Sequence, residues 1–152
     1  ENTDDPKRLA DIVHALNKVH SDLPVVLPLH PRTRRVARDL GIKFAVNIVE
    51  PIGYLEMVSL LQSCKFVLSD SGGVQKEAYF FGKSCLVLRE ETEWTELVDS
   101  GHNVLVGSDK LKIADAIKNI EYGKDFSHQF YGDGAAAELI VNEMLNFDGG
   151  PL

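Results

Sequence analysis

Residues 65–88, KFVLSDSGGVQKEAYFFGKSCLVL, hold two short apolar runs on either side of a helical segment. The runs KFVLSD and SCLVL are apolar at consecutive positions, as strands buried on both faces of a parallel sheet are. The segment between them, GGVQKEAYFFG, has the length of a helix of two or three turns and ends in a glycine. This stretch therefore predicts a strand, a helix and a second strand of an α/β fold.

The same alternation continues on both sides of this stretch. Three more apolar runs follow the strand pattern: VVLPL (25–29), FAVNIV (44–49) and NVLVG (103–107). Helical patterns cover the remaining segments: 5–20, 31–41, 54–63, 91–101, 109–121 and 134–146. In the first of them Asp5 is the expected N-cap and Pro6 the first helical residue. We predict an α/β domain with one mostly parallel sheet, and we expect its last two helices to close the domain.

The composition excludes several classes of partner. The 152 residues carry a net charge of −7, and no basic stripe or aromatic–basic pattern suggests a nucleic acid or a membrane surface as partner. No apolar run approaches the ~18 residues of a membrane span. A small anionic ligand is still compatible with the sequence, because it needs only local positive potential.

The cysteines and histidines give no metal or redox motif. Cys64 and Cys85 lie in apolar runs without paired spacing, so we expect buried free thiols in a reducing compartment, which favours a cytoplasmic location. The five histidines do not cluster, and we expect neither a metal nor a cofactor.

The order of elements bears on domain organisation. A parallel α/β unit begins with a strand, whereas the first pattern here is a helix, so we expect a strand and further chain upstream. We assign residues 1–147 to one domain and DGGPL (148–152) to a tail.

In open parallel sheets, ligands bind beyond the carboxyl ends of the strands. Polar residues follow four of the predicted strands: His30 and Arg32, Glu50 to Tyr54, Asp70 to Gly73, and Arg89 to Glu93. We expect these four loops to share one edge of the sheet.

The glycine pair is the main candidate for an anion site. Gly72 and Gly73 let a ligand approach the first turn of a helix, whose free N–H groups and dipole favour phosphate. Ser71 can cap the helix or bind a phosphate oxygen. Glu77 lies one turn beyond Gly73, where its carboxylate can accept hydrogen bonds from two ribose hydroxyls. An ordinary strand-to-helix turn, with Glu77 in solvent, explains the spacing equally well.

The loops around His30 and Glu50 also have two interpretations. His30 and the arginines of PRTRR can form a cationic wall, or His30 can simply start a helix; for Arg34 and Arg35 we favour a solvated face. The loop in EPIGYLEM can present its backbone to a planar base, or it can be a simple connection.

The last loop, REETEWTE, crowds glutamates at a strand exit. We keep Glu93 as a candidate for acid–base work and interpret the other glutamates as helix-start charges, with Thr92 as N-cap. We expect Trp94 to pack rather than to stack on a ligand.

Five segments together carry a family resemblance: LPLHPRT, EPIGYLEM, SDSGGVQKEAYFFGKSCLVLREETEW, GHNVLVGSD and YGDGAAAELI. In order and spacing they closely resemble the C-terminal half of the non-hydrolysing UDP-N-acetylglucosamine 2-epimerases. The resemblance covers nearly the whole chain, and the opening EN is similar to the end of the family's His-Arg-x-Glu-Asn segment.

This resemblance implies a two-domain GT-B-type enzyme with two Rossmann-like halves, of which this chain is the UDP-binding half. The implied reaction interconverts UDP-GlcNAc and UDP-ManNAc by elimination and re-addition of UDP, without a cofactor. The family's catalytic carboxylates lie mainly in the other, missing domain, so we expect this chain alone to bind UDP weakly and to catalyse nothing. A cytoplasmic homodimer serving cell-surface polysaccharide synthesis is the implied full-length form.

The resemblance also implies roles for particular residues. Ser71, Gly72 and Gly73 would contact the diphosphate and Glu77 the ribose. The other substrate-binding residues that it implies are Ile52 and Met57 near the uracil, and His30, Arg89 and Glu93.

The chain departs from the family at two positions, of which the first puts the sugar in question and the second is tolerated if the backbone binds the uracil. Trp94 stands where well-studied bacterial members have Arg, and Ile52 where they have Gln. A UDP-sugar with a second acetamido group, a GT-B glycosyltransferase and a UDP-sugar-sensing module are the alternatives.

Overall fold

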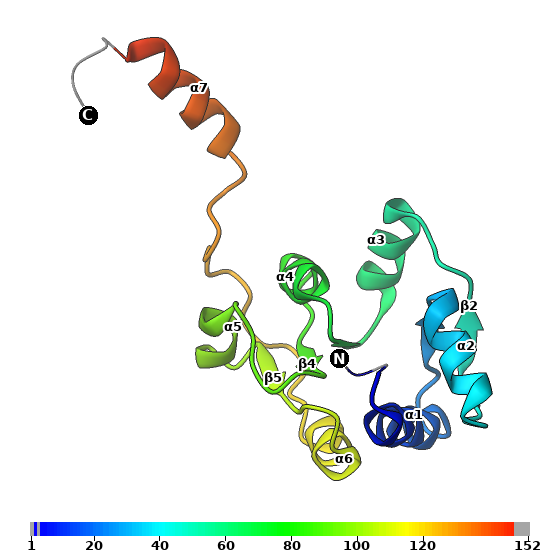
Figure 1. Ribbon diagram of the computed structural model, residues 1–152. Coiled ribbons are helices and arrows are strands. Elements are labelled where there is room, and N and C mark those ends of the chain that lie inside the picture. Colours follow the sequence, from blue (N-terminus) through cyan, green and yellow to red (C-terminus); the bar gives the residue numbers. More distant parts are fainter. Residues whose placement is uncertain (1, 3, 148–152) are drawn as a thin grey trace.

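A computed structural model describes residue 2 and residues 4–147. Helices and strands alternate along the described chain (Figure 1). The helices are α1 (Pro6–His20), α2 (Pro31–Asp39), α3 (Tyr54–Ser63), α4 (Gly72–Phe80), α5 (Thr95–Asp99), α6 (Lys110–Lys118) and α7 (Ala136–Asn146). The strands are β1 (Val26–Pro28), β2 (Asn47–Val49), β3 (Val67–Ser69), β4 (Cys85–Val87) and β5 (Asn103–Leu105). The predicted α/β class is confirmed.

The N-terminal helix forms for the local reasons visible in its sequence. The Asp5 carboxylate accepts hydrogen bonds from the N–H groups of Lys7, at 2.8 Å, and Arg8, at 3.1 Å, and Pro6 is the first helical residue. This arrangement satisfies two of the donors that a helix N-terminus leaves free. The predicted cap and helix start are therefore confirmed.

The strands are parallel, but they do not form one sheet. β1 pairs with β2, and β4 pairs with both β3 and β5; each of these pairs is parallel. In the described residues the predicted single sheet is thus wrong in detail, because no hydrogen-bonded ladder joins β1 to β3. Each strand is also only three residues long, since the ends of each apolar run continue into loops.

Helices cover both faces of the strands. α3 and α4 lie on one side and α1 and α6 on the other (Figure 1). β4 is buried at every residue, because it is the central strand of its sheet and lies under helices on both faces. The largest apolar cluster packs side chains of α1, β4 and α6 together, including Leu16, Leu86 and Ile113.

The last helix does not close the domain. α7 stands away from the other helices (Figure 1), and none of its residues is buried. The expectation that it closes the domain is therefore wrong for the described residues, although the helix itself forms. The predicted tail, residues 148–152, lies outside the described residues.

The two thiols are free, as predicted, but they are not equally buried. Burial of Cys85 in the core raises the pKa of its thiol to about 12, and partial burial also raises the pKa of Cys64. Cys64 is only half-buried, because it ends α3 at the boundary of the core. No helix of the described chain has the length and apolar character needed to cross a bilayer.

Candidate functional site

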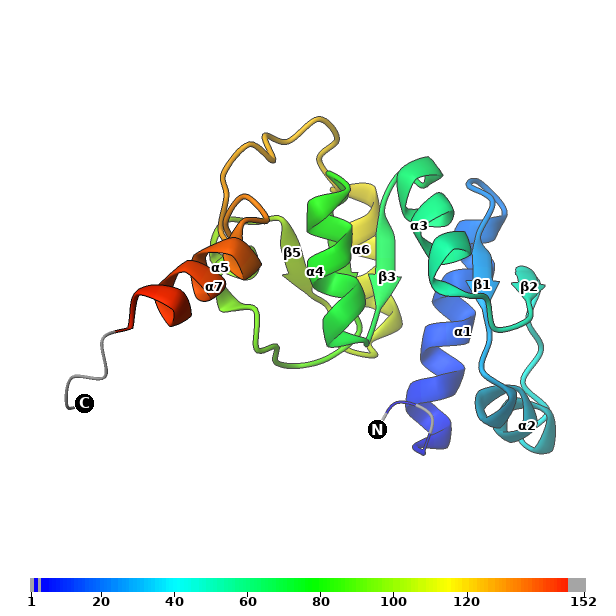
Figure 2. The ribbon, with the colours of Figure 1, turned by 90° about the horizontal axis from the view of Figure 1, so that it is seen from above.

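The residues predicted to share one edge do follow the carboxyl ends of the strands. His30 comes after β1, Glu50 after β2, Asp70 after β3 and Arg89 after β4. Parallel pairing places these ends on one side within each sheet, and Figure 2 shows β2 and β3, one from each sheet, pointing the same way. The edge predicted to bind a ligand is thus present in the structure.

The N-terminus of α4 offers free backbone donors at this edge. Ser71 occupies the N-cap position without a capping bond from its side chain, and its own N–H donates to Ser69 Oγ at 3.1 Å. The first helical bond runs from the Gln75 N–H to the Ser71 carbonyl, at 3.2 Å. The N–H groups of residues 72–74 therefore have no acceptor within the helix, and they lie at the positive end of its dipole.

Three other helix N-termini, those of α1, α2 and α6, are capped by side chains, whereas α3, α5 and α7 have no side-chain cap. Asp5, His30 and Asp109 accept backbone N–H bonds at the starts of α1, α2 and α6. The uncapped start of α4 thus differs from those three helices in having donors to offer a ligand, as phosphate sites at helix N-termini do.

The two glycines of this turn have different surroundings. A Cβ at Gly72 would overlap the Glu93 carboxylate, so a side chain at this position would displace Glu93. A Cβ at Gly73 would meet only Ser71 Oγ, at 4.0 Å. A side chain at Gly72 would therefore compete with the movable end of Glu93, whereas the missing side chain of Gly73 leaves open space above the helix end.

A chain of hydrogen bonds fixes the loop after β4 on the first turn of α4. The Thr92 hydroxyl donates to Gln75 Oε1 at 2.7 Å and accepts from the Trp94 N–H at 3.3 Å. The Trp94 Nε1–H donates to the Gly72 carbonyl at 2.8 Å. Because Gln75 is fully buried, this network holds the loop from inside the protein.

This network corrects one prediction and confirms another. Thr92 is not an N-cap: α5 begins at Thr95, with Trp94 in the cap position, because the Thr92 hydroxyl bonds to Gln75 instead. Trp94 packs within the protein, as predicted, with its ring 5.8 Å from that of Tyr131 in an edge-on arrangement.

The charges near this turn are already paired within the protein. Arg89 Nη1 lies 3.1 Å from Glu93 Oε2, so this loop places a cation and a carboxylate beside Gly72. Lys76 Nζ lies 4.8 Å from the centre of the Trp94 ring and 4.2 Å from that of Tyr131. Cation–π attraction of this kind holds an ammonium group in place without neutralising it.

Glu77 has an available carboxylate one turn beyond Gly73. Its side chain is partly buried, and no hydrogen bond or ion pair within residues 2 and 4–147 engages it. An unengaged carboxylate can accept hydrogen bonds from vicinal hydroxyls, and the role of Glu77 as a ribose ligand stays a prediction.

His30 and the neighbouring arginines make contacts within the protein, which is the simpler of the two roles predicted for them. His30 caps α2, with Nδ1 accepting from the Arg32 N–H at 3.2 Å. Arg34 Nη1 pairs with Glu50 Oε1 at 2.8 Å, on the surface. These side chains serve the start of α2 and its contact with the exit of β2, and the arrangement does not show a cationic wall.

The loop before α3 and the first turn of that helix contain Ile52 and Met57, the two residues predicted to lie near the uracil. Gly53 is the N-cap residue of α3 and makes no side-chain cap, and Ile52 beside it is half-buried. Met57 packs against the cluster that includes Leu61 and Ala78. Met57 thus supports the core beneath this edge, and Pro51 and Gly53, on either side of Ile52, are the exposed residues of the loop.

Two features of the edge were missed by the sequence reasoning. Asn2 is 6% exposed, and its Nδ2 donates to the Leu88 carbonyl at 2.6 Å and to Asp70 Oδ2 at 3.4 Å. The Lys76–aromatic cluster was also missed, although the spacing of Lys76 and Phe80 on one helical face is a signal that could have indicated it. Asn2 carries no such local signal, because its partners are more than 60 residues away.

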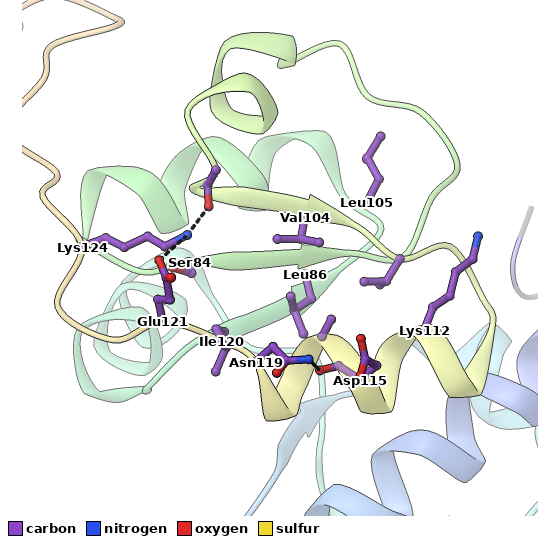
Figure 3. Close-up of a pocket in the computed structure, with 13 residues that line it drawn as sticks. Ser84, Leu86, Val104, Leu105, Lys112, Asp115, Asn119, Ile120, Glu121 and Lys124 are labelled. Carbon is purple, nitrogen blue, oxygen red and sulfur yellow. Dashed lines mark hydrogen bonds and ion pairs between the residues drawn. The ribbon is translucent and has the colours of Figure 1, made fainter.

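The edge also borders a large cavity. About 690 Å³ lies between β1 and β3, and at the carboxyl ends of the strands it is lined by His30, Ser69, Asp70 and Val74. A second cavity of about 500 Å³ lies between α6 and the strands of the second sheet, lined by Leu86, Val104 and Asp115 among others, and it contains none of the predicted site residues (Figure 3). The described residues hold no group of three or more side chains able to bind a metal ion.

Comparisons with known proteins show the family of this chain. The family model for UDP-N-acetylglucosamine 2-epimerase matches residues 1–145. A UDP-2,3-diacetamido-2,3-dideoxy-D-glucuronate 2-epimerase of Pseudomonas aeruginosa is 53% identical over 144 residues, covering 93% of this chain and 40% of that protein. The UDP-N-acetylglucosamine 2-epimerase of Escherichia coli K12 is 37% identical over 148 residues, covering 90% of this chain and 39% of that protein.

A solved structure extends the likeness to three dimensions. The UDP-GlcNAc 2-epimerase of Methanocaldococcus jannaschii, in complex with UDP-GlcNAc and UDP, superposes with a TM-score of 0.84 at 33% identity, over 95% of this chain and 42% of that one. The chain thus spans about 40% of the length of the relatives that it matches. The family resemblance drawn from the sequence is confirmed: this chain belongs to the UDP-N-acetylglucosamine 2-epimerase family.

Proposed function

We propose that the complete protein is a UDP-sugar 2-epimerase and that this chain supplies its UDP-binding part. The observation that carries the proposal is the uncapped N-terminus of α4 at Gly72 and Gly73, with the free carboxylate of Glu77 one turn away. A helix end with free N–H groups suits a diphosphate, and a carboxylate at this distance suits a ribose. Membership of the epimerase family, with a relative solved in complex with UDP, supports the same ligand.

The proposed contacts follow from the positions of these groups. The hydroxyl of Ser71 and the N–H groups of Gly72 and Gly73 bind the diphosphate, while Glu77 accepts from the ribose hydroxyls. The other residues of the edge are assigned according to the loop in which they lie. Ile52 and Met57 border the uracil. His30, Arg89 and Glu93 border the rest of the substrate.

The reaction proposed for the complete protein inverts the sugar at C2. UDP leaves with its bonding electron pair while a base removes the C2 proton; UDP then adds back as a proton is delivered to the opposite face. The helix end of α4 contributes by stabilising the negative charge of the leaving diphosphate. We assign the acid and base mainly to the part of the protein outside this chain, and we expect this chain alone to have no epimerase activity.

The sugar is proposed from the degree of identity. The relative named for the 2,3-diacetamido glucuronate is 53% identical, against 38% for a UDP-N-acetylglucosamine 2-epimerase homolog of Methanococcus maripaludis and 37% for the Escherichia coli enzyme. We therefore place a UDP-linked 2,3-diacetamido hexuronate first and UDP-GlcNAc second. We also propose a cytoplasmic homodimer that supplies sugars for cell-surface polysaccharides; the free thiols suit a reducing compartment.

The reaction is tested with the complete protein in D₂O. Each of the two UDP-sugars is incubated with the enzyme, and proton NMR follows the signal of the C2 hydrogen. We expect exchange of this hydrogen and formation of the C2 epimer without any acceptor, faster with the diacetamido hexuronate. Transfer of the sugar to an acceptor without C2 exchange would indicate a glycosyltransferase instead, and binding without chemistry would indicate a sensing module.

The binding site is tested by calorimetric titration of UDP into Glu77→Ala and Glu77→Gln. Loss of the charged acceptor should weaken binding by about 1–3 kcal/mol, or roughly 5- to 150-fold. Glu138→Ala is the matched control, since Glu138 is an exposed helical glutamate on α7, away from the site. Unchanged affinity in both Glu77 variants would show that Glu77 is not the ribose ligand.

A further inference from the structure

The chain between α6 and α7 turns back past α5 (Figure 2), and its residues 124–131 form no helix or strand. Side chains from α4 and from the start of β5 nevertheless hold its backbone. The Tyr79 hydroxyl donates to the His128 carbonyl at 2.5 Å, across 49 residues of sequence. His102 Nε2 lies 2.8 Å from the Asp125 carbonyl oxygen, which can only accept, so this nitrogen is the donor. The segment 124–131 therefore has a fixed place against α4.

Tyr131, at the end of this segment, packs against rings of α4 and of the loop before α5. Its ring centre lies 5.8 Å from that of Trp94 at an interplanar angle of 85°, and 5.7 Å from that of Phe80 at 76°. Such edge-to-face pairs attract, because the positive edge of one ring meets the negative face of the other. The ring of Tyr131 thus links α4 to the loop that carries Trp94.

The ammonium group of Lys76 lies close to both of these rings. Its Nζ is 4.2 Å from the centre of the Tyr131 ring and 4.8 Å from that of the Trp94 ring. A cation within about 6 Å of a ring centre is attracted by the negative face of the ring. Within the described chain no ion pair engages this ammonium group, so aromatic rings are what hold it. We call Lys76, Trp94 and Tyr131 the aromatic clamp.

The aromatic clamp reaches the first turn of α4 through the Trp94 indole. Its Nε1–H donates to the Gly72 carbonyl at 2.8 Å, and Gly72 is the first residue of α4. The Ser71 side chain makes no capping bond, and the glycines at 72 and 73 have no side chains to restrict the backbone of this turn. The direction of the free N–H groups therefore depends on contacts from outside the helix, and the indole supplies one of them.

We propose that the aromatic clamp positions the diphosphate seat: Tyr131 and Lys76 fix the Trp94 ring, and Trp94 fixes the backbone whose N–H groups bind the ligand. Tyr131 and Lys76 act through Trp94 and are therefore positioning residues. The inference rests on the proposed function, because it takes UDP as the ligand of this turn. Its physical basis is preorganisation, since donors that are already oriented lose less freedom when the ligand binds.

Paired substitutions separate positioning from simple packing. Tyr131→Phe keeps the aromatic ring, whereas Tyr131→Leu keeps an apolar side chain without a ring face. Lys76→Arg keeps a cation that can stack on an aromatic ring, whereas Lys76→Met keeps a long stem without the charge. Positioning by the aromatic clamp predicts that ring and charge decide the outcome, whereas packing predicts that side-chain volume does.

The first experiment uses the complete protein without ligand, labelled with nitrogen-15. NMR follows exchange of the Trp94 indole proton with D₂O, and the signal is assigned by its loss in Trp94→Phe. We expect exchange at least about tenfold faster in Lys76→Met and Tyr131→Leu, because the indole leaves its carbonyl acceptor more often. Lys76→Arg and Tyr131→Phe should exchange as wild type does. Lys118→Met and Tyr122→Leu are the matched controls, since both residues are exposed and lie outside the aromatic clamp.

The second experiment is calorimetric titration of UDP into the same variants, with the urea midpoint of each recorded. We expect Lys76→Met and Tyr131→Leu to bind UDP about tenfold more weakly than wild type, and Lys76→Arg and Tyr131→Phe to stay within about twofold of it. If Tyr131→Leu does not fold, Lys76→Met alone decides.

Three results would overturn the proposal: wild-type indole exchange in Lys76→Met and Tyr131→Leu, faster exchange with unchanged UDP affinity, or weaker binding only where the urea midpoint also falls. Failure of the proposed function gives a different result. In that case wild type itself does not bind UDP, and the indole exchange still shows whether the aromatic clamp holds Trp94.

Discussion

At the scale of single residues, Gly72 and Gly73 differ in what surrounds the place of their missing side chains. The Gly72 backbone is crowded by the Glu93 carboxylate and holds the Trp94 indole through its carbonyl, whereas Gly73 faces open space. Two adjacent residues of the same type therefore have different reasons to lack a side chain. Substitution by alanine at each position distinguishes these reasons.

We expect Gly73→Ala to preserve the fold and even to stabilise α4 by up to about 1 kcal/mol, because alanine favours helix. The same change should weaken UDP binding at least about tenfold, since its methyl group occupies the space above the free N–H groups. Gly72→Ala should change the free energy of unfolding by no more than about 1 kcal/mol, because the exposed Glu93 carboxylate can move aside at the cost of its surface ion pair with Arg89. Urea denaturation and UDP calorimetry measure the two effects, and full UDP affinity in Gly73→Ala would contradict the proposed seat.

At the scale of secondary structure elements, helix caps make stability depend on pH. Asp109 Oδ1 accepts from the N–H groups of Leu111, at 2.7 Å, and Lys112, at 3.2 Å. These two bonds lower the pKa of the Asp109 carboxyl below its usual value of 3.8. The charged form is thus favoured by folding, so the contribution is present above the unfolded pKa and is lost as the pH falls through the folded pKa.

Asp109→Asn keeps an oxygen acceptor at the cap but removes the titrating charge. We expect wild type to exceed this variant in urea midpoint at pH 7 and the difference to shrink at about pH 3. The pKa of Asp11 is lowered by its contact with Lys110. Because Asp11 titrates in both proteins, its contribution cancels when their urea midpoints are compared. A difference that stays constant between the two pH values would show that the charge of Asp109 does not stabilise the start of α6.

The elements also show how far the sequence determines the structure. Helix starts such as Asp5 with Pro6, and the loops at the carboxyl ends of the strands, were predicted because caps and apolar runs are local signals. The division into two sheets, the hydrogen bond from Thr92 to Gln75 and the burial of Asn2 were not. Each of these depends on contacts between distant parts of the chain, which leave no periodic pattern.

The exposure of α7 escaped prediction for a related reason. Its apolar side chains have the same periodicity as those of a packed helix, and Leu145 is nevertheless 78% exposed. Periodicity indicates that a helix has an apolar face, but it does not indicate what covers that face. The sequence predicted the backbone of the candidate site, at Gly72 and Gly73. It did not predict most of the side-chain contacts that support this backbone.

At the scale of the whole molecule, the reactivities of the two thiols depend on different extents of unfolding. Cys85 is fully buried in β4, and burial raises its pKa to about 12, whereas Cys64 is half-buried and lines the cavity between β1 and β3. Only a thiolate reacts readily with a disulfide reagent. Reaction of Cys85 therefore requires both exposure and deprotonation, which unfolding of the core supplies.

We expect Cys64 to react with Ellman's reagent in the native protein at pH 8 and Cys85 to react only as fast as the core unfolds. The Cys64→Ser variant isolates the Cys85 reaction, whose rate should rise with urea in parallel with global unfolding. Rapid labelling of Cys85 in the native Cys64→Ser variant would show that β4 is less protected than its burial indicates.

The contact between Trp94 and Gly72 also has an optical consequence. Trp94 is the only tryptophan among the 152 residues, and its indole N–H is bonded to the backbone of the proposed phosphate seat while Lys76 lies over its ring. Indole emission responds to nearby charge, so a diphosphate arriving at Gly73 should shift or quench the fluorescence of the whole protein. A UDP titration should then give a saturable change that is absent in Trp94→Phe, and an unchanged spectrum at saturating UDP would place the ligand elsewhere. Trp94 is thus an intrinsic fluorophore in direct contact with the proposed phosphate seat.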